Sequence, residues 1–341
     1  MAENKRFFYG WLILLTCILI MGLGYAPLVS CASLFTKPVT EDLGFTRSGY
    51  ALVSTIAALM MAFMSPFIGK IMSKPYMHKA LVVCMIGNCL AYYCYSFAST
   101  LPQFYVTAAC IGFFECGSTM IPVSVLITNW FRKKRGLVMS IAMVGSSIGG
   151  TILSPIIGNL IASQGWRFTY KAVGITRLVI LVPLVLLVIR RTPADMGTKA
   201  YGADEEGETG KARKTEREWN VSLKEVKKKP MFWCFVLGCT LISATAAVIT
   251  QIPASVMDAG YATTTAASIA SLYLFIAIPG KLVLGHIYDR YGVKAGILFG
   301  NTMFFLSVIC LIFIKHQPFL YLMAILFGFG TCIGTVSAPV I

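Results

Sequence analysis

The chain has 341 residues, of which 57% are hydrophobic and 13% charged, and its mean hydropathy is +0.75. Soluble domains carry about 25% charged residues, so this composition predicts an all-α membrane protein with several spans. The formal net charge is +15, but the basic residues cluster beside the apolar runs, which indicates membrane topology rather than binding to nucleic acid. All eleven cysteines lie inside or at the ends of apolar runs, which favours packing over disulfides or metal ligands.

Ten apolar runs are long enough to cross a bilayer, which takes about 20 residues. The first run is longer than the apolar core of a secretory signal and has no small-residue cleavage site, so we interpret it as a span. The predicted spans are 9–35, 48–72, 79–98, 103–130, 136–162, 170–189, 231–257, 266–288, 294–314 and 318–341.

The distribution of basic residues predicts the orientation of these spans. With the N-terminus in the cytoplasm, the inner segments hold 22 Lys and Arg residues and the outer segments hold five. Lysine and arginine concentrate in cytoplasmic loops of membrane proteins. We therefore expect a multi-pass protein of the plasma (inner) membrane with a cytoplasmic N-terminus.

The stretch 190–230 differs in kind from the rest of the chain. It is polar, mixed in charge and nearly free of large apolar residues, which is typical of a cytoplasmic linker. It separates a six-span bundle, residues 1–189, from a four-span bundle, residues 231–341.

The two bundles contain an internal repeat. A shift of 216 residues places Gly69 on Gly285, and a shift of 217 places Gly117 on Gly334. Matching features at nearly one offset predict two parallel six-helix repeats with a substrate site near the membrane midplane. On this pattern the second repeat lacks its last two helices, so we expect the sequence to be a truncated form of a longer chain.

A lysine and a turn motif lie together around the end of the span 266–288. Lys281 is inside the apolar run, where a charge costs about 2.5–3.5 kcal/mol on insertion scales and needs a partner or a water-filled cavity. The pattern Gly-x-x-x-Asp-Arg-x-Gly follows, made by Gly285, Asp289, Arg290 and Gly292. The glycines allow two helix ends to approach closely, and the Asp-Arg pair can hold those ends together electrostatically.

Several short motifs occur in an order and spacing that resemble one family. They are residues 8–11, 34–38, 41–48, 130–131, 135–137, 165–167, 192–202 and 280–292. With these motifs the chain resembles the major facilitator superfamily, most closely its monocarboxylate-transporter and oxalate–formate-exchanger branch. The resemblance implies a major facilitator fold and a secondary transporter of a small organic anion, a mono- or dicarboxylate. Transport would proceed by alternating access, as antiport or as proton symport.

Three positions depart from the pattern of that branch. Lys281 stands where the branch usually has arginine, and lysine meets a carboxylate as a point charge rather than bidentately. Ala277 stands where proton-coupled members have an aspartate, which slightly favours exchange or an unassigned coupling mode. The first-repeat copy of the turn keeps Gly69 but has Ser73 in place of the aspartate, so we expect its gating contact to differ.

Three charged residues inside spans are candidates for transport chemistry. Lys281 either anchors a substrate carboxylate, as the resemblance implies, or snorkels to the interface. Glu115 lies near the middle of its span and is a packing residue, a proton-coupling group or a salt-bridge partner. For Arg177 we favour snorkelling outward over pairing with Glu115 or binding an anion.

Polar and small residues inside spans form a second group of candidates. Tyr25, Gln251 and Tyr273 can reach a central cavity, although each is more often a packing or helix-bending residue. The small residues at 145–150 favour close helix packing in lipid over substrate contact.

The sequence has no nucleophile–base arrangement, Walker loop or zinc spacing, so we expect neither an enzyme nor a metal or cofactor site. The expected partners are an organic anion and the lipid bilayer, with no nucleic acid and a monomeric chain. Two alternatives stay open. One is a facilitator for an uncharged solute, with Lys281 only snorkelling, and the other is a non-transporting remnant or sensor.

Overall fold

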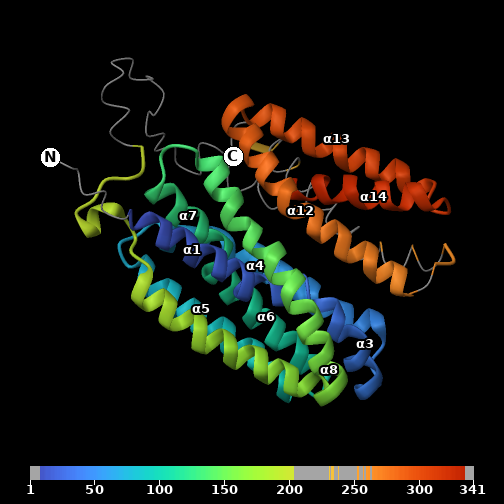
Figure 1. The fold of residues 1–341 in the computed structure, drawn as a ribbon. Helices are drawn as coiled ribbons and strands as arrows, with labels where there is room; N and C mark the ends of the chain where they lie inside the picture. The colour runs from blue at the N-terminus through green and yellow to red at the C-terminus, as the bar shows by residue number, and fades with distance from the viewer. Residues whose placement is uncertain are drawn as a thin grey trace. The chain divides into compact units, whose positions relative to one another are not determined.

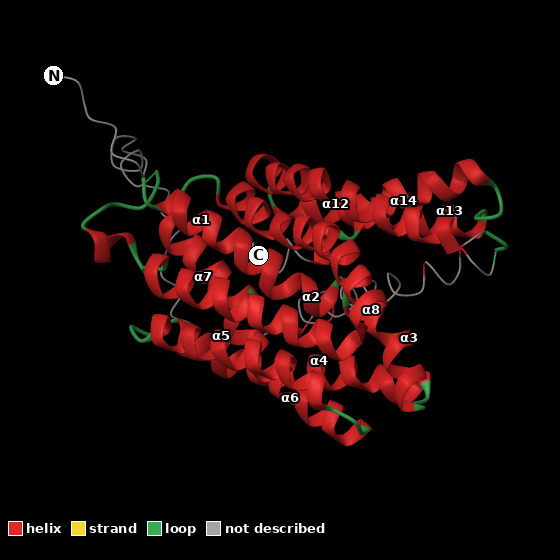
Figure 2. Cartoon of the chain, turned by 60° about the horizontal axis from the view of Figure 1, so that its bottom comes forward, coloured by secondary structure: helices red, strands yellow, loops and turns green. Residues whose placement is uncertain are grey.

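The computed structural model describes residues 8–202, 259–261 and 263–334, and also residues 230, 232, 233, 237, 252 and 256. In these residues the regular structure is helical (Figure 1, Figure 2). Eight helices of the described part are long and apolar enough to cross a membrane, which confirms the prediction of an all-α membrane protein. Gln251, most of the predicted span 231–257 and most of the predicted linker lie outside the described residues.

The chain divides into two compact units. The first comprises Met1–Phe131 and Ile141–Thr198, and the second comprises Arg132–Ser140 and Lys199–Ile341. The short segment Arg132–Ser140 therefore groups with the second unit, although its neighbours in sequence on both sides belong to the first.

The first span consists of four helical segments. α1 (Gly10–Leu19) continues into the π-helical segment η1 (Ile20–Tyr25), and α2 (Ala26–Val29) and α3 (Ala32–Leu43) follow. π-helical turns are rare in proteins. Where one occurs inside a longer helix, it often lies at a functional site. Gly44 ends α3 with a φ of +66°, a left-handed conformation that favours glycine at helix ends.

The next three spans follow at the predicted positions. Side-chain caps begin two of them: Thr46 accepts a hydrogen bond from the Gly49 amide at 3.1 Å, and Thr100 with Gln103 forms a capping box. Such caps satisfy amides that the start of a helix leaves unpaired and are worth about 1 kcal/mol each. The helices are α4 (Arg47–Met72), α5 (Met77–Cys94) with η2 (Tyr95–Phe97), and α6 (Leu101–Ser118) with α7 (Met120–Trp130).

Two predicted spans, 136–162 and 170–189, lie within one element, α8 (Arg135–Val188). Gly165 interrupts it with a φ of +81° and a ψ of 165°, a conformation open to glycine and rarely to other residues. Two helical runs therefore meet at this residue, as the two predicted spans require. The short helix η3 (Pro193–Met196) follows.

The small residues of α8 pack against η1. A Cβ built on Gly22 would lie 3.2 Å from the Gly145 carbonyl oxygen, and one built on Gly149 would overlap the backbone of Gly22. Close helix pairs in membranes are rich in such small residues, because they let two backbones approach. The packing role predicted for residues 145–150 agrees with this geometry.

Aromatic side chains fill much of the core of the first unit. Phe35 stacks on Tyr170 with ring centroids 4.0 Å apart, and Trp166 belongs to the same cluster. The Trp166 Nε1 donates a hydrogen bond to Asp42 at 3.0 Å. This bond joins two of the motifs on which the family resemblance depends, although they are far apart in sequence.

The second unit contains three described spans around one apolar core. They are α12 (Thr263–Tyr291), α13 (Val293–Ile312) and α14 (Gln317–Gly330), which lie side by side (Figure 1). Gly292 joins the first two with a φ of +82°, so the last glycine of the turn motif is where a tight connection requires one.

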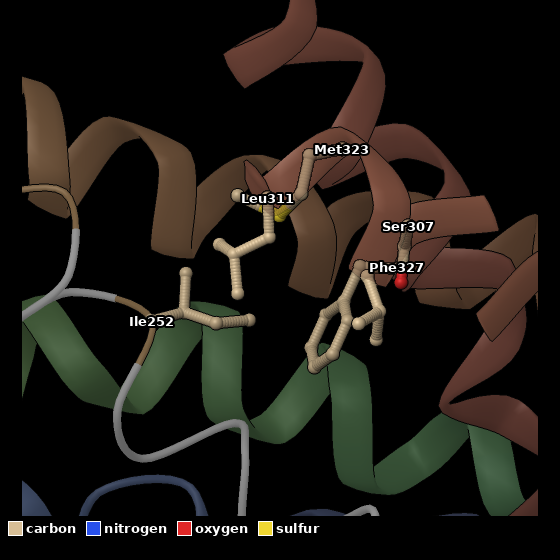
Figure 3. Close-up of a pocket in the computed structure, with 6 residues that line it drawn as sticks. Ile252, Ser307, Leu311, Met323 and Phe327 are labelled. Carbon is tan, nitrogen blue, oxygen red and sulfur yellow. The ribbon is translucent and has the colours of Figure 1, made fainter. Parts of the chain in front are cut away.

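A small apolar pocket lies in this core (Figure 3). Its volume is ≈ 10 Å³, which suits at most one water molecule. The Ser307 hydroxyl donates to the Phe304 carbonyl at 2.6 Å, so it is already satisfied. The pocket is therefore a packing gap and too small for a carboxylate substrate. Its lining residues are Ile252, Ser307, Val308, Leu311, Met323 and Phe327.

Candidate functional site

Glu115 is a buried acid of the first unit. It lies near the end of α6 and is 5% exposed. Its two carboxylate oxygens accept separate hydrogen bonds, from Asn88 Nδ2 to Oε2 at 2.7 Å and from Thr119 Oγ1 to Oε1 at 2.9 Å. A buried carboxylate needs such donors, because an unpaired charge inside a span is costly.

Asn88 links this acid to a buried base. Its Oδ1 accepts a short hydrogen bond from Arg177 Nη2, and the same nitrogen donates to the Gly24 carbonyl oxygen at 2.9 Å. The Arg177 Cζ lies 4.9 Å from the centre of the Tyr92 ring, a distance typical of a cation–π contact. Glu115, Asn88, Arg177 and Gly24, which we call the buried polar cluster, join α6, α5, α8 and η1.

The prediction that Arg177 snorkels outward is wrong. Its side chain is 1% exposed, whereas snorkelling requires the charged group to reach water or the interface. A direct ion pair with Glu115 is not formed either, because the Asn88 amide lies between the two charges and bonds to both.

Sequence reasoning missed Asn88 and Thr119. A signal for Asn88 was present, because it is a polar amide in the interior of the apolar run 79–98, and such residues in spans usually bond across helices. Thr119 carries no such signal, because a threonine hydroxyl commonly bonds to the backbone of its own helix.

Lys281 is a buried base of the second unit. It lies in α12 and is 4% exposed. The neighbouring Gly280 sits against the end of α14, since a Cβ built there would lie 2.9 Å from Cys332 Sγ and 3.3 Å from the Gly328 carbonyl oxygen. This burial disfavours the alternative in which Lys281 snorkels to the interface.

The turn after α12 binds the start of α8, and both segments belong to the second unit. Asp289 Oδ1 accepts from the Gly136 amide and Oδ2 accepts from the Leu137 amide, each at 2.9 Å. The carboxylate thus caps the positive end of a helix. Gly285 permits this approach, because a Cβ there would lie 2.8 Å from the Gly136 carbonyl oxygen and would overlap Ser140.

Arg290 makes a different contact from Asp289. Its Cζ lies 5.6 Å from the centre of the Tyr291 ring, and the bonds that join the two helix ends run from Asp289 to backbone amides. The contact between the two helix ends is therefore the helix cap made by Asp289.

Among the other predicted residues, Tyr273 belongs to the second unit, and Tyr25 and Gly69 belong to the first. Tyr273 packs against Phe327 in the core of the second unit, with ring centroids 5.3 Å apart. Tyr25 is half-buried at the end of η1. A Cβ on Gly69 would meet nothing within 4 Å, so this glycine makes no close approach of the kind seen at Gly285.

A family model described as Major Facilitator Superfamily matches residues 12–341. Among curated proteins, the chain is similar to Monocarboxylate transporter 2 of Homo sapiens, with 23% identity over 229 residues. That alignment covers 66% of this chain and 45% of the relative. The chain is also similar to MFS-type transporter pytF of Aspergillus terreus, with 26% identity over 209 residues, or 61% of this chain and 62% of the relative. It therefore spans roughly half the length of these two relatives.

Among solved structures, the chain is similar to a bacterial homolog of the human lysosomal transporter Spinster in an inward-facing and unoccupied conformation. The TM-score is 0.64 at 16% identity, and the match covers 99% of this chain and 75% of the other. At this identity the likeness concerns the fold.

Proposed function

The chain belongs to the Major Facilitator Superfamily, and from that premise we propose that it is a secondary transporter of small organic anions in the plasma membrane. The observation that carries the proposal is Lys281, a base held inside a membrane span at 4% exposure. The similarity to a monocarboxylate transporter supports the same class of substrate.

A buried lysine attracts an anion to a site inside a membrane span. Its charge costs about 2.5–3.5 kcal/mol at the membrane centre, and a bound carboxylate offsets part of that cost. The attraction between the two charges is stronger there than in water, because the surroundings screen it less. An uncharged solute gains nothing from this term, so Lys281 discriminates between the two classes.

Asp289 is the proposed brace of one conformational state. Alternating access needs two states whose contacts differ. The two bonds from Asp289 to the start of α8 hold α12 in place, and such a side-chain helix cap is worth about 1–2 kcal/mol. Substrate binding promotes reorientation when it stabilises the state in which these bonds are broken.

The test is uptake of labelled mono- and dicarboxylates by proteoliposomes that contain the full chain. Lys281→Ala is expected to lower uptake at least about 10-fold, which corresponds to about 1.4 kcal/mol of binding energy. Lys294→Ala is the matched control, because Lys294 is an exposed lysine at the start of α13. Uptake that is unchanged in Lys281→Ala, or equal uptake of the methyl ester, would contradict an anion site and favour an uncharged solute.

The coupling mode requires a second comparison in the same vesicles. We propose Glu115 as the proton-coupling group if transport is symport, and no such role for it if transport is exchange. In symport, an inward proton gradient drives uptake in the wild type, and Glu115→Gln abolishes that response. In exchange, uptake follows the carboxylate loaded inside and Glu115→Gln leaves the gradient response unchanged.

A further inference from the structure

The buried polar cluster has a fixed hydrogen-bond direction. Arginine has only donors, so the Asn88 oxygen must face Arg177 and the Asn88 NH₂ group must face Glu115. The opposite amide orientation would set donors of Asn88 against donors of Arg177. The amide therefore always offers a hydrogen to Glu115 Oε2, which favours an acceptor at that atom.

Thr119 lets the other carboxylate oxygen accept or release a proton. Its hydroxyl lies 2.9 Å from Glu115 Oε1 and 3.1 Å from the Glu115 backbone oxygen. When the carboxylate is ionised, the hydroxyl donates to Oε1. When Oε1 carries a proton, the hydroxyl turns, accepts that proton in a hydrogen bond and donates to the backbone oxygen. Both charge states thus fit the same heavy-atom positions.

Arg177 is the charge that decides between these two states. Among the described residues, the titratable groups within electrostatic range of Glu115 are Arg177 of α8, Tyr25 of η1, Cys89 of α5 and Cys116 of α6. α4 and α7 also pack on α6, but the charged residues of α4 lie at its two ends and α7 contains none. The positive charge reaches the carboxylate through one polar group, the Asn88 amide.

We propose that Asn88 and Arg177 are positioning residues that hold Glu115 as a carboxylate, with Thr119 as the group that accommodates its proton. Only the consequence for transport rests on the proposed function: if transport is proton symport, Asn88 and Arg177 favour the ionised form of the group that carries the proton. The charge state of Glu115 is a property of the first unit, and it can be measured without a substrate.

The experiment follows the carbonyl stretching band of a protonated carboxylic acid by infrared difference spectroscopy. The full chain is held in lipid while the pH is varied, and Glu115→Gln assigns the band. In Asn88→Leu and Arg177→Met we expect the band to appear at a pH at least about one unit higher than in the wild type, because the support for the ionised carboxylate is lost. Ser118→Ala is the matched control, because Ser118 is equally buried but donates to the backbone oxygen of Glu115; it should behave as the wild type.

The same proton dependence in Asn88→Leu and the wild type would overturn the proposal. Asn88→Leu keeps both charges, so it decides the question even where Arg177→Met does not fold. A chain that moves no carboxylate but shows the expected band shift would refute the proposed function and leave this inference intact.

Discussion

The turns that begin at Gly69 and Gly285 align at a shift of 216 residues, yet their side chains form different hydrogen bonds. In the second unit, Asp289 reaches across to the amides of Gly136 and Leu137 at the start of α8. In the first unit, Ser73 occupies the aligned position, and its hydroxyl donates to the Lys70 carbonyl of its own helix at 2.8 Å. The carboxylate caps another helix, whereas the hydroxyl at the aligned position bonds only within its own helix.

The turn of the first unit is held from outside by a different residue. Arg191, which follows α8, donates from Nη2 to the Ser73 backbone oxygen at 2.8 Å. Arginine thus satisfies a carbonyl at the end of a helix, where a positive charge is also favourable. Side chains of opposite charge therefore hold the two aligned turns. Asp289 accepts hydrogen bonds from backbone amides in one turn, and Arg191 donates to a backbone carbonyl in the other.

The largest difference between the turns should come from their first glycines. Gly285→Ala is expected to lower the free energy of unfolding by about 1–3 kcal/mol, because its Cβ would overlap Ser140 and the backbone of Gly136. Gly69→Ala is the matched control and should raise stability by about 0.5–1 kcal/mol, since the site is open and helical. Thermal unfolding in detergent measures both. A rise in stability for Gly285→Ala equal to that for Gly69→Ala would mean that the close approach at Gly285 does not exist.

The acid of the second turn should give the next largest effect. Asp289→Ala removes a helix cap and is expected to cost about 1–2 kcal/mol of unfolding free energy. Ser73→Ala should change stability by less than about 0.5 kcal/mol, because the exposed hydroxyl bonds only to its own helix. Asp289→Asn keeps one oxygen acceptor and should destabilise the protein less than Asp289→Ala. Equal losses for the two variants would contradict the helix-capping role of Asp289.

The smallest effect is expected at the base of the first turn. Arg191→Ala removes an exposed bond to Ser73 and should cost roughly 0.5–1 kcal/mol. Arg191→Lys keeps the charge and should recover part of that loss. If Arg191→Ala proved as damaging as Asp289→Ala, the two turns would be braced equally.

Much of the fold and of the second turn could be predicted from the sequence. Length and hydropathy decide the spans, and the glycine of the 165–167 motif marks the junction inside α8 because only glycine suits its backbone. The resemblance to the major facilitator superfamily is confirmed by the family match. Gly285 lies at a close approach of two helix ends, as predicted, whereas a Cβ on Gly292 would meet nothing within 4 Å, and this glycine serves the turn through its positive φ.

The buried polar cluster could not be predicted in the same way. In α5 and α6 the apolar residues are spread around the helix rather than along one face, so no periodicity indicates which face meets protein and which meets lipid. Arg177 was therefore assigned to the wrong environment, and Asn88 was not singled out. The partner of Asp289 was missed for another reason, because backbone amides carry no sequence signal and α8 begins about 150 residues earlier.

The junction at Gly165 has a consequence for anyone who engineers this protein. Helical structure runs up to the glycine on both sides, so two spans are joined without an extended segment. Proteases cut, and inserted epitopes are tolerated, at exposed loop tips with free backbone. Residues 162–165 are exposed, but the backbone on both sides of Gly165 is helical, so a tag or cleavage site placed there would have to displace helix.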